Sequence, residues 1–165
     1  MRNAGLMAIG ATLFMGAANA HVTLENRQAA VGSYYKAVFA VPHGCAGSAT
    51  TKIRVQIPEG VIAIKPMPKP GWSIETVKGK YAAEYELHGS RLTEGVKEVV
   101  WSGGKLADDN YDEFVMASFL TPGLKPNSTL YFPVVQAGRQ ETRQRKGQGA
   151  ADIATTASRR HPASG

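Results

Sequence analysis

Apolar and polar residues alternate along much of this chain, with the period of two that β-strands require. The clearest case is residues 50–57 (TTKIRVQI), in which three β-branched aliphatic residues alternate with Lys52, Arg54 and Gln56. This pattern predicts a strand with one buried face and one solvated face. Further strands are predicted at residues 33–41, 60–65, 72–77, 81–87, 98–102, 113–119 and 129–135.

Turn-forming residues separate these segments, and the chain body shows no convincing 3.6-residue period of an amphipathic helix. Prolines at every second position of residues 66–70 exclude a central strand or a helix there. Gly103-Gly104 and Pro122-Gly123 mark two further turns. Short strands at regular spacing predict an all-β fold, a single antiparallel β-sandwich of immunoglobulin-like or cupredoxin-like type.

Residues 1–20 have the composition of a secretory signal peptide. A basic start is followed by an apolar run over residues 4–17 and by Ala18-Asn19-Ala20, a small-x-small cleavage signal. The run is shorter than the roughly 20 apolar residues that a spanning helix needs. We therefore expect cleavage after Ala20, export to the periplasm or the extracellular space, and no membrane span in the mature chain.

Cleavage at this point makes His21 the first residue of the mature protein. The α-amine and the ring Nδ1 of an N-terminal histidine can close on one metal ion as a chelate, whereas an internal histidine has no amine to offer. The alternative is that signal peptidase must leave some residue first, and that His21 holds this position by coincidence.

The net charge of +6 is concentrated near the C-terminus. Six basic and two acidic residues give residues 137–165 a charge of +4, and Arg2 leaves with the signal peptide, so residues 21–136 keep only +1. A nearly neutral domain has no electrostatic footprint for a phosphate backbone, which argues against a nucleic-acid-binding function.

The composition also changes at Gln136. Residues 137–165 are mostly Arg, Gln, Ala, Gly, Ser and Thr, with Ile153 as the one bulky aliphatic residue and with no Phe, Tyr or Trp. Such a segment buries little apolar area to offset the entropy lost on ordering. We therefore expect one folded domain over residues 21–136, followed by a disordered basic tail over residues 137–165.

One cysteine, Cys45, is present, and it lies in the tripeptide His43-Gly44-Cys45 between two predicted strands. A single cysteine is a thiol, a metal ligand or half of an intermolecular bridge. Imidazole and thiolate suit copper or zinc, and the thiolate favours Cu(I). The alternative is a solvated turn histidine. The acidic residues 108–113 lack the spacing of a calcium loop and are interpreted as a solvated loop.

Several short motifs occur in a particular order along the chain. They are His21-Val22-Thr23-Leu24, Gly32-Ser33-Tyr34, Val41-Pro42, Thr50-Thr51-Lys52, Ile57-Pro58-Glu59-Gly60-Val61, Pro70-Gly71-Trp72, Trp101-Ser102-Gly103-Gly104 and Tyr111-Asp112-Glu113-Phe114. In this order they resemble the YcnI-like copper-binding domain family over residues 21–136. The resemblance implies an exported β-sandwich that binds one copper ion, with His21 supplying amine and imidazole in a histidine brace.

The chain departs from that family in two places. Where the best-known form has a glutamate ligand after the first long strand, this chain has His43 and Cys45, which are the candidate ligands by position. Similar members continue after the last strand with a cysteine and a tryptophan, whereas this chain continues with Ala137 and the basic tail. Either a frameshift or a divergent end accounts for the difference.

These observations predict a copper-handling protein: a chaperone, a store or a transport accessory that binds Cu(II) through His21 and also Cu(I) through a thiolate. Its expected partners are the copper ion and other copper-handling proteins of the cell envelope. No common catalytic motif is present, so we expect no enzyme activity. The alternatives are a structural or adhesive β-sandwich without metal and a copper monooxygenase.

Overall fold

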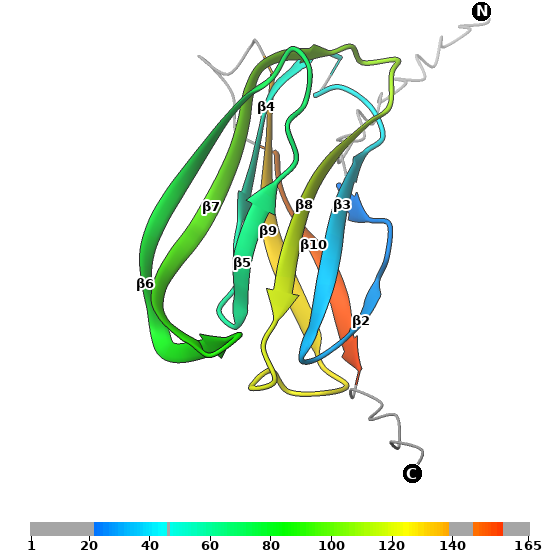
Figure 1. The fold of residues 1–165 in the computed structure, drawn as a ribbon. Coiled ribbons are helices and arrows are strands. Elements are labelled where there is room, and N and C mark those ends of the chain that lie inside the picture. Colours follow the sequence, from blue (N-terminus) through cyan, green and yellow to red (C-terminus); the bar gives the residue numbers. More distant parts are fainter. Residues whose placement is uncertain (1–21, 46, 139–146, 157–165) are drawn as a thin grey trace, which may run out of the picture.

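The computed structural model describes residues 22–45, 47–138 and 147–156, and these residues form strands and connecting turns. Four strands make one sheet in the order β1-β3-β8-β5, and six make a second in the order β2-β10-β9-β4-β7-β6 (Figure 1). The first sheet, sheet A, comprises β1 (Thr23–Leu24), β3 (Ser33–Val41), β8 (Asp112–Leu120) and β5 (Val61–Pro66). The second, sheet B, comprises β2 (Gln28–Ala30), β10 (Gly147–Thr156), β9 (Thr129–Gly138), β4 (Thr50–Gln56), β7 (Ser90–Leu106) and β6 (Ser73–Leu87).

The two sheets enclose one hydrophobic core, which confirms the predicted all-β sandwich. Alternation along β4 places Ile53 and Val55 inward, both with no exposed surface, as the sequence pattern predicted. Aromatic rings from both sheets meet in the core: Trp101 of β7 packs edge-to-face on Phe114 of β8, with ring centroids 5.6 Å apart. Edge-to-face packing of this kind adds to the stabilisation that burial itself provides.

No helix long and apolar enough to cross a membrane occurs in the described part of the chain. Residues 1–21, which include the predicted signal peptide and His21, lie outside it.

A long β6–β7 hairpin replaces the separate strands that were predicted at residues 72–77, 81–87 and 98–102. Lys80 lies opposite Glu94 and Tyr85 lies opposite Leu92, so residues 81–84 of β6 face a single residue of β7. This bulge is held by the Glu59 carboxylate, which accepts hydrogen bonds from the Ala82 amide at 3.0 Å, the Tyr85 hydroxyl at 2.7 Å and Lys97 Nζ at 2.7 Å.

Substituting Glu59→Gln should destabilise the fold at neutral pH and much less in acid. Burial alone would raise the pKa of Glu59, but hydrogen bonds from Lys97, Tyr85 and Ala82 outweigh it and lower that pKa. A carboxyl whose pKa is lowered by folding stabilises the protein above its unfolded pKa, and this stabilisation is lost as pH falls through the folded pKa. Urea unfolding at neutral and at acidic pH measures the effect, with Glu75→Gln on β6 as control. An equal loss of stability at neutral and at acidic pH would contradict the expectation.

The structure corrects the predicted disorder of residues 137–165 in the two stretches that it describes, residues 137–138 and 147–156. Strand β9 continues through Ala137 and Gly138, and β10 lies between β9 and β2 in sheet B (Figure 1). β10 pairs with β9 over eight residues, and its Ile153 and Ala151 side chains belong to the core. A strand that inserts between two others satisfies its backbone polar groups in the ladder, so few apolar side chains suffice to hold it. Residues 139–146 and 157–165 lie outside the described residues.

Candidate metal site

One end of the sandwich carries the residues that the sequence singled out. Val41, at the end of β3, pairs with Asp112 at the start of β8, and Thr50, at the start of β4, pairs with Gly138 at the end of β9. We call this the His43 end, because the connection between β3 and β4 contains His43 (upper end in Figure 1). Residue 46 of this connection lies outside the described residues.

Strand β1 leads the chain into the fold at the same end. Thr23 pairs with Ala40 and Leu24 with Phe39, in antiparallel register. Moving toward the N-terminus along β1 therefore means moving along β3 toward His43. Val22 and Leu24 are both buried in the core, so they anchor the start of the described chain here.

The backbone around His43 is tied to two other elements. The Gly44 amide donates to the Asp108 carbonyl at 3.4 Å, and Cys45 and Ser48 exchange backbone hydrogen bonds of 2.7 and 3.0 Å. A Cβ atom at Gly44 would lie 2.4 Å from the Ser48 carbonyl oxygen and 2.7 Å from the Asp108 Cα. Only glycine fits between these two backbone segments, which explains the middle residue of the tripeptide.

His43 and Cys45, both half-buried, are directed to different neighbours. His43 Nδ1 lies 3.9 Å from Asp108 Oδ1 and 2.8 Å from the Gly44 carbonyl oxygen, whereas Cys45 Sγ lies 3.8 Å from the Gln136 carbonyl oxygen. Within residues 22–45, 47–138 and 147–156, no three His, Cys, Asp or Glu side chains are grouped closely enough to hold a metal ion. Imidazole and thiolate of this tripeptide therefore belong to no three-residue ligand cluster among the residues that the structure describes.

Gln136 is a polar residue that the sequence analysis did not identify as important. Its side chain is buried, and Nε2 donates to the His43 carbonyl at 2.9 Å, the Gly44 carbonyl at 3.1 Å and Thr50 Oγ1 at 2.7 Å. Oε1 of the same amide is buried without a hydrogen-bond partner among the described atoms. Gln136 thus clamps the backbone of His43 and Gly44 to β9. In the sequence, the available signal for this role was a glutamine that directly follows the apolar residues Val134 and Val135.

Side-chain oxygens of Thr23 and Glu113 lie on the outer face of sheet A beside β1. Thr23, Ala40 and Glu113 form one row across β1, β3 and β8, and paired residues of neighbouring strands share a face. The Tyr111 hydroxyl donates to Glu113 Oε1. That hydrogen bond comes first among the causes that raise the pKa of Tyr111 to about 12, with smaller contributions from burial and from the nearby Glu113 and Glu25 charges.

Asp112 and Glu113 thus belong to β8 rather than to the solvated loop that was expected over residues 108–113. Asp112 is paired with Lys69 Nζ at 2.5 Å. The Glu113 carboxylate lies on the row of Thr23 and accepts the hydrogen bond from Tyr111. Carboxylate oxygen together with amine and imidazole nitrogen is a donor set that suits Cu(II).

Comparison with known proteins places the chain in a family and in a fold. The family described as a domain of unknown function, DUF1775, matches residues 21–165. An uncharacterized protein from Nocardia farcinica with an immunoglobulin-like fold superposes with a TM-score of 0.56 at 22% identity, over 82% of this chain and 98% of that one. The seventh ScaB type I cohesin of Pseudobacteroides cellulosolvens gives a TM-score of only 0.39 at 9% identity, over 85% of this chain and 94% of that one. No curated protein sequence matches the chain.

Proposed function

We propose that this chain, which belongs to the DUF1775 family of YcnI-like domains, is an exported copper-binding protein that holds one Cu(II) ion through His21. The observation that carries the proposal is the position of His21 directly after a small-x-small cleavage signal. Its role is to carry or store copper for other proteins of the cell envelope, without catalysis.

The anchoring of β1 supports this proposal. Val22 and Leu24 are buried, so a metal bound at residue 21 would be held next to a rigid strand rather than on a loose end. Thr23, two residues after His21 in the sequence, lies on the outer face of sheet A, because its neighbour Leu24 is buried and successive residues of a strand point to opposite faces. Glu113 lies on that face, in the row of Thr23. We therefore propose Glu113 as an oxygen ligand that completes the Cu(II) site.

His43 and Cys45 remain candidate ligands for Cu(I), at the same end of the sandwich. Thiolate sulfur is the donor that favours Cu(I), whereas the amine, imidazole and carboxylate favour Cu(II). Use of Cys45 requires its Sγ to turn away from the Gln136 carbonyl oxygen. Two ligand sets at one end would let the protein hold copper in both oxidation states.

The competing function is a structural or adhesive β-sandwich without metal. One observation favours it: the described residues bring no three metal-ligating side chains together. A copper monooxygenase is a third candidate, because a histidine brace can also activate oxygen. Metal titration separates the copper carrier from the structural module, and oxygen consumption with a reductant separates it from the oxygenase.

Adding one Met before His21 should weaken Cu(II) binding by at least about 100-fold, or about 2.7 kcal/mol. The extra residue converts the α-amine into an amide and so removes the chelate. Binding by the processed protein should also weaken as pH falls, because protons compete for the amine and the imidazole. Competition titration and the Cu(II) electron paramagnetic resonance spectrum give the readout. Equal affinity of the two forms would contradict the proposal.

Three substitutions then identify the remaining ligands. Glu113→Gln should weaken Cu(II) binding and change its resonance spectrum, whereas Glu75→Gln on the far edge of sheet B should leave both unchanged. His43→Ala and Cys45→Ser should each weaken Cu(I) binding more than Cu(II) binding. If none of the three moves either affinity by more than about tenfold, or about 1.4 kcal/mol, these side chains are structural and the site is completed elsewhere.

A further inference from the structure

The β6–β7 hairpin leaves sheet B and reaches across to sheet A. Both of its strands belong to sheet B, yet His88 at its turn contacts Tyr34 of β3 in sheet A. Gly79 and Gly95 lie opposite each other in the hairpin, with a register shift on each side of this pair. Glycines and bulges inside strands allow a sharp bend. We call residues 80–94, beyond the glycine pair, the strap, and Figure 1 shows the hairpin curving toward β5.

A row of apolar residues lies on the outer face of sheet A, next to the strap. Tyr34 of β3 pairs with Phe119 of β8, which in turn pairs with Ile62 of β5. Tyr34 is 61% exposed whereas its neighbour Tyr35 belongs to the core, so the row faces outward. Ile62 nevertheless has no exposed surface, although it is not among the core residues. It is therefore covered from outside, where the strap and β5 line a common pocket of about 200 Å³.

Tyr34 and His88 form a clasp at the tip of the strap. Tyr34 Oη lies 2.7 Å from His88 Nε2, and the two rings stack with centroids 6.2 Å apart. A tyrosine hydroxyl both donates and accepts, so it can bond to either tautomer of the imidazole. Leu87 pairs with Ser90 around a two-residue loop, in which His88 has a φ of +51° and Gly89 one of +75°. Such loops favour Asn-Gly, and the ring stacking on Tyr34 is a contact that asparagine cannot make.

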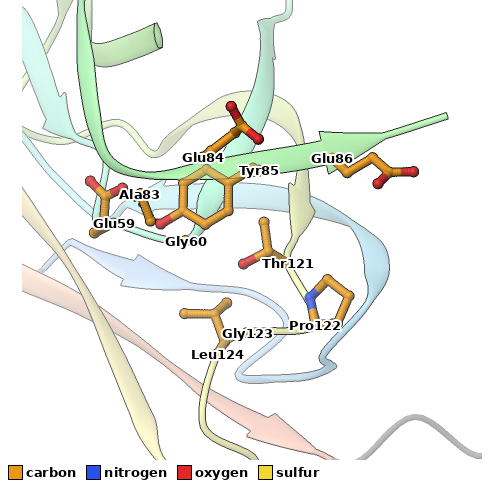
Figure 2. Close-up of a pocket in the computed structure, with 10 residues that line it drawn as sticks. All are labelled: Glu59, Gly60, Ala83, Glu84, Tyr85, Glu86, Thr121, Pro122, Gly123 and Leu124. Carbon is orange, nitrogen blue, oxygen red and sulfur yellow. Dashed lines mark hydrogen bonds between the residues drawn. The ribbon is translucent and has the colours of Figure 1, made fainter. Parts of the chain in front are cut away.

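The strap itself packs loosely on the rest of the molecule. None of residues 80–94 is buried. A pocket of about 570 Å³ lies between the strap and the turn after β8, where Tyr85 faces Thr121 and Leu124 (Figure 2). Besides the clasp, two hydrogen bonds to the Glu59 carboxylate hold the strap. Segments with so few buried contacts open at a lower free energy than the domain as a whole.

We propose that the strap is a lid that opens as one unit by bending at Gly79 and Gly95. Opening breaks the clasp and the hydrogen bonds to Glu59, and it uncovers Ile62 and Phe119 on the outer face of sheet A. Glycine has the backbone freedom to change the angle of the bend, because it carries no side chain. The remainder of the sandwich stays folded, since its core lies between the two sheets and includes no residue of the strap.

Thiol labelling at the covered row tests this opening, in a Cys45→Ser background that removes the natural thiol. The Ile62→Cys thiol should react at least about tenfold faster than the Val55→Cys thiol, each rate being divided by the global unfolding rate of its own variant. Val55 is a matched control because it is equally buried but lies in the core. Labelling at position 62 that is no faster than global unfolding would overturn the proposal. So would labelling as fast as that of a free thiol, because the strap would then cover nothing.

Variants of the clasp test what holds the lid closed. Tyr34→Phe removes the hydroxyl, and His88→Asn removes the ring while keeping a residue that suits the loop. Each should speed labelling of the Ile62→Cys thiol at least about fivefold, and the double variant should add nothing further, because both changes break one contact. Tyr131→Phe removes the hydroxyl of another exposed tyrosine, on β9, and should have no effect. Unchanged labelling in both clasp variants would show that Tyr34 and His88 do not hold the strap. All of these measurements are made without metal, so their outcome is independent of the copper proposal.

Discussion

A chain that ends after Gly138 should lose several kcal/mol of stability and unfold at markedly lower temperature or urea concentration. The truncation removes β10 and with it the buried Ile153 and Ala151 side chains. Replacing one buried Ile by Ala typically costs about 2–5 kcal/mol. A domain of this size is stable by about 5–15 kcal/mol in total, so removing the whole strand takes much of that margin.

The truncation also leaves polar backbone unpaired. β10 hydrogen-bonds β9 over eight residues and pairs with β2 over three, from Gln28 to Ala30. Without it, β9 becomes a sheet edge and β2 loses its partner in sheet B. Thermal and urea unfolding followed by circular dichroism measure the loss.

Two further chains make this prediction sharper. A chain that ends after Thr156 keeps all of β10 and should match the full-length protein in stability. Ile153→Ala in the full-length chain should cost about 2–4 kcal/mol, because its side chain has no exposed surface. If the chains ending at Gly138 and at Thr156 unfold alike, β10 does not pack on the sandwich.

Substituting Gly138→Cys should create a disulfide with Cys45 and stabilise the oxidised protein by about 2–4 kcal/mol. A Cβ atom at Gly138 would lie 3.3 Å from the Cys45 Cβ, close to the roughly 3.5–4.5 Å of disulfides. It would also lie 3.1 Å from the Ala49 carbonyl oxygen, so a small backbone shift accompanies bridging. The bridge would close a loop of about 90 residues, and long loops gain most from closure.

Thiol titration and unfolding with and without reductant measure this effect. Gly138→Ser and the double variant Cys45→Ser, Gly138→Cys are the controls, and neither should respond to reductant. A Gly138→Cys protein that is equally stable with and without reductant would contradict the prediction. The oxidised variant also separates the two proposed copper ligand sets, since it should keep Cu(II) binding through His21 and lose any Cu(I) binding through Cys45.

The alternation of side chains was sufficient to predict the sandwich and much of its core. Ile53 and Val55 alternate with Lys52 and Arg54, and a period of two places such residues on opposite faces wherever the strand lies. Local sequence patterns were also sufficient to predict the turn at Gly44, although only the structure explains why a glycine is needed there. These features depend on residues that are close together in the sequence.

Features that depend on distant residues were decided by the tertiary structure. Gln136 clamps His43 although some 90 residues separate them, and Glu113 lies in the row of Thr23 only because β3 joins β1 to β8. The pocket beside Thr121 is formed by segments that no sequence pattern connects. Cα pairing and side-chain contact of this kind arise only when the strands have assembled.

The segment after Gln136 shows the difference most clearly. Its composition predicted disorder, because side-chain burial was the only source of stability that composition can reveal. In the fold, β9 and β2 offer backbone partners on both sides of residues 147–156, so Ile153 and Ala151 are enough to hold the strand. The sequence by itself determined the strand pattern; the neighbours of each strand, and hence the pairing of residues 147–156, were determined by the assembled sheets.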